Sequence, residues 1–63
     1  MLKLGKISAE AIAKWMGKTR RYLNLHKNEC YNILSQYCRF HFIKTGNGES
    51  VYIDEIYEAT YQG

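Results

Sequence analysis

The chain has 63 residues, of which 46% are hydrophobic and 24% charged, with two cysteines and no proline. This length predicts a single domain, residues 1–63, and excludes a second catalytic lobe. Its ordinary complexity argues against a disordered or collagen-like chain. Apolar runs are short and no basic, apolar leader opens the sequence, so we expect no membrane span and no signal peptide, and assign the protein to the cytoplasm.

Charge is unevenly divided along the chain. All nine lysines and arginines lie in residues 1–47 beside only two acids, which gives this part a charge of +7. Residues 48–63 carry four acids and no lysine or arginine, a charge of −4. A basic body favours a polyanion such as nucleic acid, because neutralising phosphates releases counterions, although scattered solvated charges give the same count.

The first predicted helix covers residues 8–16. Ser8 is a typical N-cap residue, and Ile7 and Ile12 have the spacing of a hydrophobic staple. Gly17 is placed to end the helix in a left-handed conformation. These signals together predict a short amphipathic helix.

An apolar stripe predicts helix over most of residues 19–38, with a break in the polar stretch before Asn28. Thr19 can cap one helix over 19–25 and Asn28 another over 28–38, although one bent helix fits the same pattern. The helix after Thr19 opens with two arginines, which have the wrong sign for the positive end of a helix dipole. An external anion could compensate them.

Cys30 and Cys38 would lie about 12 Å apart in such a helix. A disulfide requires Cα atoms within about 7 Å, so the two cannot pair within the chain. Together with His26 and His41 they show no metal-binding spacing. We expect two reduced thiols on one buried helix face and no structural metal.

From Arg39 the pattern changes to that of a β-hairpin, with Asn47-Gly48 as its two-residue turn. One face of this hairpin would join the core. The predicted cross-strand pairs are Phe42 with Ile53, Lys44 with Val51, His41 with Asp54 and Ile43 with Tyr52. Helical spacing then returns and predicts a short closing helix capped by Asp54, with a strand continued to Tyr57 as the competing interpretation.

The sequence carries no enzyme signature: no glycine-rich phosphate loop, nucleophile elbow or cofactor fingerprint. His41 opposite Asp54 is interpreted as a cross-strand polar pair on an exposed ribbon. We therefore expect no catalysis, no cofactor and no small-molecule substrate. The aromatic and aliphatic residues assigned to the core are Trp15, Leu34, Phe40, Phe42 and Ile53.

Ala13, Gly17 and Leu23 recur at the spacing of a helix-turn-helix, and the basic run 18–21 and a hairpin follow them. This order resembles the winged helix-turn-helix architecture of small excisionase and replication or transcription regulators of phages and plasmids. The resemblance covers residues 7–58. It implies an α+β, mostly helical fold with three short helices, a two-stranded hairpin wing and a short C-terminal helix. The third helix departs from the minimal excisionase layout and leaves open which helix reads bases.

The resemblance implies a sequence-recognising double-stranded DNA-binding protein, a transcriptional, recombination or replication regulator of a mobile element. Arg20 and Arg21 would contact phosphates, although exposed arginines are often merely solvated. Asparagine, glutamine and tyrosine on an exposed helix face can contact bases or phosphates, and are also ordinary surface residues. The candidate DNA contacts are Lys18, Thr19, Arg20, Arg21, Tyr22, Asn24, Lys27, Asn28, Asn32, Gln36, Lys44 and Asn47.

The alternative is a protein–protein interaction module that uses the acidic end of the chain. Tyr52, Tyr57 and Tyr61 would bind a host protein or a second copy in a homodimer, because tyrosine combines an apolar body with a polar tip. Salt distinguishes the two functions: phosphate-driven binding weakens steeply as salt rises, whereas an apolar protein interface changes little.

Overall fold

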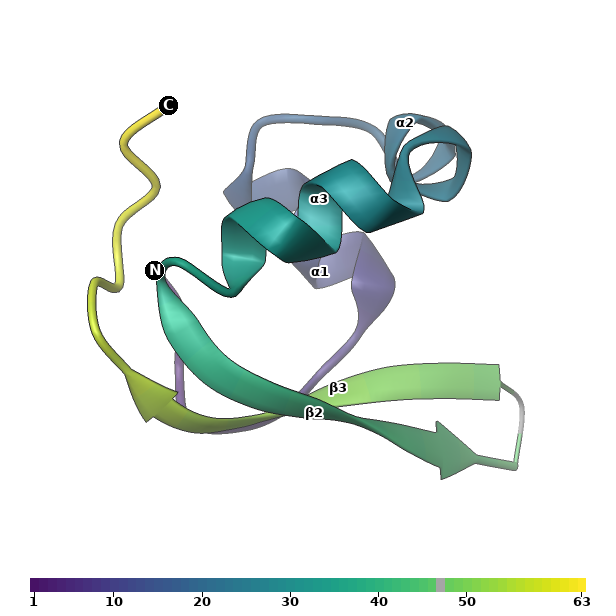
Figure 1. Ribbon diagram of the computed structural model, residues 1–63. Coiled ribbons are helices and arrows are strands. Elements are labelled where there is room, and N and C mark those ends of the chain that lie inside the picture. Colours follow the sequence, from purple (N-terminus) through teal and green to yellow (C-terminus); the bar gives the residue numbers. More distant parts are fainter. Residues whose placement is uncertain (47) are drawn as a thin grey trace.

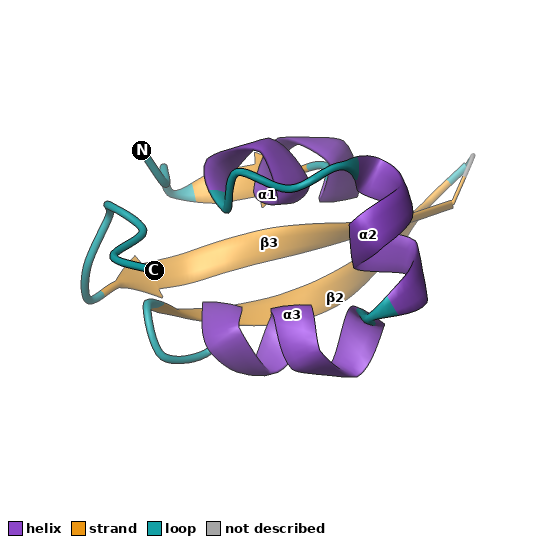
Figure 2. Ribbon diagram, turned by 90° about the horizontal axis from the view of Figure 1, so that it is seen from above, coloured by secondary structure: helices purple, strands orange, loops and turns teal. Residues whose placement is uncertain are grey.

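The computed structural model describes residues 1–46 and 48–63, which form three helices on one face of a three-stranded antiparallel sheet (Figure 1). The elements are β1 (Gly5–Ile7), α1 (Ala9–Trp15), α2 (Arg20–Leu25), α3 (Lys27–Leu34), β2 (Cys38–Thr45) and β3 (Gly48–Ile56). The strand order is β1-β3-β2. Figure 2 shows α1 and α3 along the two sides of the sheet, with α2 between them at the end nearer the hairpin tip. Among the described residues, no helix is both long and apolar enough to cross a membrane.

The first two helices begin where their capping residues predict. Ser8 Oγ accepts a hydrogen bond from the Ala11 backbone N–H at 3.2 Å and starts α1. Thr19 Oγ1 accepts one from the Tyr22 N–H at 3.0 Å and starts α2. Between them, Gly17 has a φ of 72°, the left-handed conformation expected at the helix end.

The third helix differs from its prediction at both ends. It begins at Lys27, and the residue before it, His26, makes no side-chain capping bond, so Asn28 is not the cap. It ends at Leu34 instead of residue 38, because a tight turn follows in which the Tyr37 N–H donates to the Leu34 carbonyl. From Cys38 onward the backbone pairs with β3, and this pairing prevents the helix from continuing.

The hairpin is present, but its register is shifted by two residues. Thr45 pairs with Gly48, so Gly48 belongs to β3 and not to the turn, and Asn47 lies outside the described residues. Observed pairs are His41 with Tyr52, Phe42 with Val51, Ile43 with Ser50 and Lys44 with Glu49. Because side chains alternate with a period of two, this shift leaves the β2 and β3 residues of the predicted pairs on their predicted faces.

The sheet has a third strand that the sequence analysis did not predict. Residues of β1 pair with β3, Gly5 opposite Ile53 and Ile7 opposite Val51. A strand of three residues that includes a glycine is too short to show the alternation of apolar and polar side chains that predicts a strand. Its formation depends on its hydrogen bonds to β3. The winged helix-turn-helix expectation of a two-stranded hairpin therefore becomes a three-stranded sheet with β3 at its centre.

The prediction of a short closing helix is wrong, and the competing prediction, a strand continued to Tyr57, is nearer to the structure. β3 continues to Ile56, because its backbone is paired with β2 as far as that residue. The remaining tail folds back across the molecule. The Ala59 carbonyl accepts hydrogen bonds from the Leu2 N–H and from Trp15 Nε1, both at 2.9 Å.

The core lies between the helices and the inner face of the sheet. Its buried residues are Leu2, Ala9, Ile12, Ala13, Met16, Leu23, Cys30, Leu34, Cys38, Val51 and Ile53. Leu34 and Ile53 thus occupy the core as predicted. Trp15 and Phe40 are partly buried and pack against this cluster. Phe42 was assigned to the core wrongly, because its side chain is 53% exposed.

Both cysteines are unpaired and buried, as predicted. They do not share a helix, however, because Cys38 is the first residue of β2. Its thiol donates a 3.6 Å hydrogen bond to the Leu34 carbonyl. Burial raises the pKa of both thiols, and the Glu29 carboxylate raises that of Cys30 further.

Substituting Gly17→Ala should lower the free energy of unfolding by about 1–2 kcal/mol, the cost of a left-handed conformation for an L-residue. The added Cβ meets no atom within 4 Å, so backbone strain is the whole cause. Gly46→Ala is the matched control, since its Cβ also enters open space and its φ is not positive. Urea denaturation measures both variants, and an equal loss in the two would contradict the assignment.

The raised pKa values predict that the folded protein reacts with a thiol reagent at pH 8 much more slowly than the same protein in urea, because the thiolate is the reactive form. Mass spectrometry after mild oxidation should show no intramolecular disulfide. Rapid labelling of both thiols under native conditions would mean that this part of the core opens readily.

Candidate nucleic-acid interface

The connection between α1 and α2, together with α2 itself, presents five of the twelve predicted DNA contacts to solvent. Lys18, Arg20, Arg21 and Asn24 are all exposed. The Arg20 guanidinium donates to the Asn24 side-chain carbonyl one helical turn away, so these two polar groups lie together on the outer surface of α2. Lys18 Nζ sits 5.0 Å from the centre of the Tyr22 ring, in cation–π geometry.

The beginning of α3 brings two further predicted residues beside α2. Lys27 and Asn28 are exposed, and with Arg20 they line a surface hollow of about 300 Å³. Its remaining walls come from α1, α3 and β2. The full lining is Ala9, Arg20, Lys27, Asn28, Tyr31 and Phe42.

None of the described residues that line this hollow carries a carboxylate. The carboxylates of the described ion pairs lie beside other basic side chains: Glu10 beside Lys14, Glu29 beside His26, Glu55 beside Arg39, and Asp54 beside His41. Within the described part of the chain, Lys18, Arg20, Arg21 and Lys27 therefore carry charge that no ion pair neutralises. The first turn of α2 also contains no acidic residue.

Asn32, Gln36 and Lys44 lie apart from this group, whereas Tyr22 belongs to α2 itself. Asn32 is further along α3, and Gln36 falls in the turn after the helix has ended, so neither lines the hollow. Lys44 is exposed on β2 close to the hairpin loop. Tyr22 is half-buried, with its ring 4.5 Å from the His26 ring.

Two aromatic residues at the hollow escaped the sequence analysis. Tyr31 was not singled out, and Phe42 was assigned to the core. Their ring centres are 5.0 Å apart in an edge-to-face arrangement, and Phe42 packs edge-to-face on Phe40 at 5.6 Å. An eight-residue helix spans about 12 Å and an eight-residue strand about 26 Å, so α3 is too short to cover the whole of β2. No sequence signal marked this open strand end, because the helix was predicted to continue to residue 38.

The outer face of the sheet carries a different set of side chains. His41 Nδ1 and Asp54 Oδ2 are 2.8 Å apart, so the predicted contact exists, although the register places Tyr52 directly opposite His41. The Tyr52 ring lies 5.4 Å from the imidazole. Lys6 of β1 is also opposite Tyr52, so this face is a mixed polar surface that includes the exposed Tyr52 ring.

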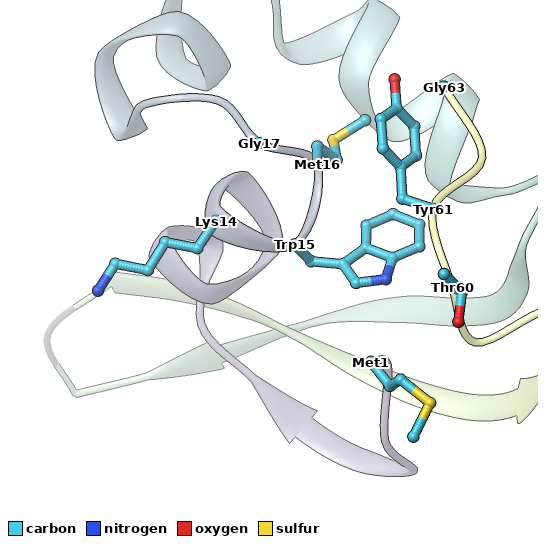
Figure 3. A pocket seen from close by; sticks show the side chains of 8 residues that line it. All are labelled: Met1, Lys14, Trp15, Met16, Gly17, Thr60, Tyr61 and Gly63. Atoms are coloured by element: carbon cyan, nitrogen blue, oxygen red, sulfur yellow. The ribbon is translucent and has the colours of Figure 1, made fainter.

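The three tyrosines of the predicted protein interface occupy different environments. Tyr61 is partly buried, with its ring 5.3 Å from Trp15 and 5.7 Å from Tyr37. Figure 3 shows Tyr61 and Trp15 side by side on the wall of a hollow of about 460 Å³, with the Lys14 side chain pointing away from them. Tyr57 is 57% exposed and Tyr52 is 42% exposed.

Comparison of the chain with models of protein families, with curated proteins and with solved structures finds no match. Within residues 1–46 and 48–63, no three side chains of histidine, cysteine, aspartate or glutamate gather as metal ligands would. The chemistry of the candidate interface thus rests on its cations, amides and aromatic rings.

Removing the Thr19 hydroxyl with Thr19→Ala should lower the free energy of unfolding by about 1 kcal/mol, because the Tyr22 N–H loses its capping acceptor. Thr60→Ala, in the exposed tail, should stay within about 0.5 kcal/mol of the parent. Thermal unfolding followed by circular dichroism compares the two. If Thr60→Ala costs as much, the effect does not belong to the α2 cap.

Proposed function

We propose that this protein binds double-stranded DNA through α2 and the neighbouring start of α3, with the β2–β3 hairpin as an accessory contact. The observation that carries the proposal is the group formed by Lys18, Arg20, Arg21 and Lys27: four exposed cations that no described ion pair neutralises. Neutralisation of phosphates by such a group releases counterions and supplies most of non-specific DNA affinity.

The shape of α2 is compatible with a groove-binding role. An α-helix with its side chains is about 10–12 Å across, and the DNA major groove, about 12 Å wide, admits one. Arg20 and Asn24 share one surface of this helix, and arginine and asparagine are residue types that hydrogen-bond guanine and adenine edges. Of these two, Asn24 is our candidate for base recognition, while Lys18, Arg20 and Arg21 are candidates for phosphate contacts.

The arrangement also supports a winged helix-turn-helix role for the molecule. Gly17 makes the turn between α1 and α2, and β2 and β3 form a hairpin whose loop lies at the same end of the molecule as α2 (Figure 2). Lys44 lies near this loop and would reach an adjacent phosphate. We infer a regulator of transcription, recombination or replication, because a chain without catalytic signature acts on DNA by occupying it.

Replacing two charges on α2, Arg20→Gln with Arg21→Gln, should weaken binding to a random-sequence duplex by about tenfold at low salt. The slope of log affinity against log salt should fall by about 2, one for each lost phosphate contact. Fluorescence anisotropy with a labelled duplex at several sodium chloride concentrations measures both quantities.

The matched control removes two exposed charges that lie outside α2 and outside the hollow, Lys3→Gln with Lys6→Gln. This variant has the same net charge as the α2 variant but should keep nearly the parent affinity. Equal weakening in the two variants would show that net charge alone governs binding. A parent protein that binds no duplex at low salt would overturn the proposed function.

A protein-binding surface is the second candidate, favoured by the exposure of Tyr57 and Tyr52. Both lie in the acidic part of the chain, which would repel DNA. Sedimentation of the parent with and without salt tests this role, because self-association through apolar tyrosine surface would persist at high salt, unlike phosphate contacts.

A further inference from the structure

The hollow between α2, α3 and β2 combines two kinds of group that a groove-binding surface does not require together. Arg20, Lys27 and Asn28 supply hydrogen-bond donors and positive charge on one side. Tyr31 and Phe42 supply aromatic surface on the other. Contact with the phosphates of a DNA duplex needs only the charged and hydrogen-bonding side chains. The two aromatic rings indicate a ligand that also has an apolar, planar part.

Phe42 is the decisive residue because its exposure is costly. Phe42 lies on the inner face of the sheet but is 53% exposed, whereas Val51 and Ile53 on the same face are 1% exposed. The Phe42 ring therefore lacks the stabilisation that burial gives to those two side chains. Tyr31 and Phe40 hold it by edge-to-face contacts, which fix its position while more than half of its surface stays open.

We infer that this hollow binds one unpaired nucleotide, with its phosphate against Arg20 and Lys27 and its base against Phe42. The inference rests on the proposed function and deepens it by naming the nucleic-acid state that the site prefers. A volume of about 300 Å³ is at the small end of ligand sites, which suits a single nucleotide unit and no more. In paired DNA the faces of a base are covered by its neighbours, so only a bulged, flipped or single-stranded nucleotide can offer one to Phe42.

The described lining residues include no carboxylate, which fits the same ligand. Arg20 and Lys27 would repel a cationic aromatic molecule and would find no charge on a neutral one, whereas a nucleotide carries both a phosphate and a planar ring. Asn28 adds an amide that can donate to or accept from a base edge. The chemistry of an aromatic base joined to a phosphate is common to an unpaired nucleotide in a strand and to a free mononucleotide.

The test compares a fully paired duplex with the same duplex carrying one bulged thymidine, by fluorescence anisotropy at fixed salt. The parent should bind the bulged duplex about tenfold more tightly, within the range that stacking of a base on an aromatic side chain supplies. Phe42→Leu should abolish this preference and leave affinity for the paired duplex unchanged. Tyr52→Leu, an exposed ring on the other face of the same sheet, should keep the preference.

A second variant guards against a folding defect in Phe42→Leu. Lys27→Gln alters an exposed side chain and should weaken binding to the bulged duplex more than to the paired one, whereas Lys6→Gln should affect neither. Circular dichroism of each variant confirms folding. Thymidine 5′-monophosphate serves as competitor: displacement of the bulged duplex by the mononucleotide in the parent, and not in Phe42→Leu, supports the site and shows that it also accepts the free nucleotide.

The outcomes separate this inference from the proposed function. A parent that binds both duplexes equally, or a Phe42→Leu variant that retains the preference, overturns the nucleotide hollow while duplex binding stands. A parent that binds the bulged duplex or the mononucleotide but not the paired duplex overturns the proposed function and supports the hollow.

Discussion

The position of β3 between β1 and β2 is the constraint on which the remaining structure depends. Val51 and Ile53 of this strand are 1% exposed and form the floor of the core, while its backbone is paired on both sides. Three short helices could not bury enough surface on each other, since isolated helices of six to eight residues are not stable in water. The sheet supplies the apolar surface against which they fold.

The same sheet explains why the candidate interface is open. Short helices over longer strands leave part of the inner face uncovered, and that part lies where α2, α3 and β2 meet around Phe42. Cations gather there because α2 and α3 both begin with basic residues, Arg20 and Lys27. The interface is thus a consequence of unequal element lengths together with the charge at two helix starts.

Capping residues and the turn glycine predicted the first two helices. Ser8, Thr19 and Gly17 act through hydrogen bonds or dihedral angles within a few residues, so the first two helices could be placed from sequence. Longer-range competition decided the rest. The helical spacing after Asp54 yielded to pairing along β3, and the short β1 exists only through its partner.

The candidate site was predictable in its charges and not in its shape. Arg20 and Lys27 were identified from their types and positions, but their meeting at one hollow depends on how α3 packs beside α2. Phe42 could not be placed correctly, because an alternating strand pattern gives the face of a side chain and not what covers it. The register error had little effect for the same reason: a shift of two residues preserves the face.

The hydrogen bonds to the Ala59 carbonyl have a practical consequence for handling the molecule. They tie residue 59 to Leu2 and to the Trp15 side chain, and both chain ends lie at the end of the sheet opposite the hairpin loop (Figure 2). A fluorophore, affinity tag or surface linkage joined to either terminus therefore projects away from α2 and the hairpin loop. Single-molecule or surface-based assays can attach the protein by either end and still present that region to a ligand in solution.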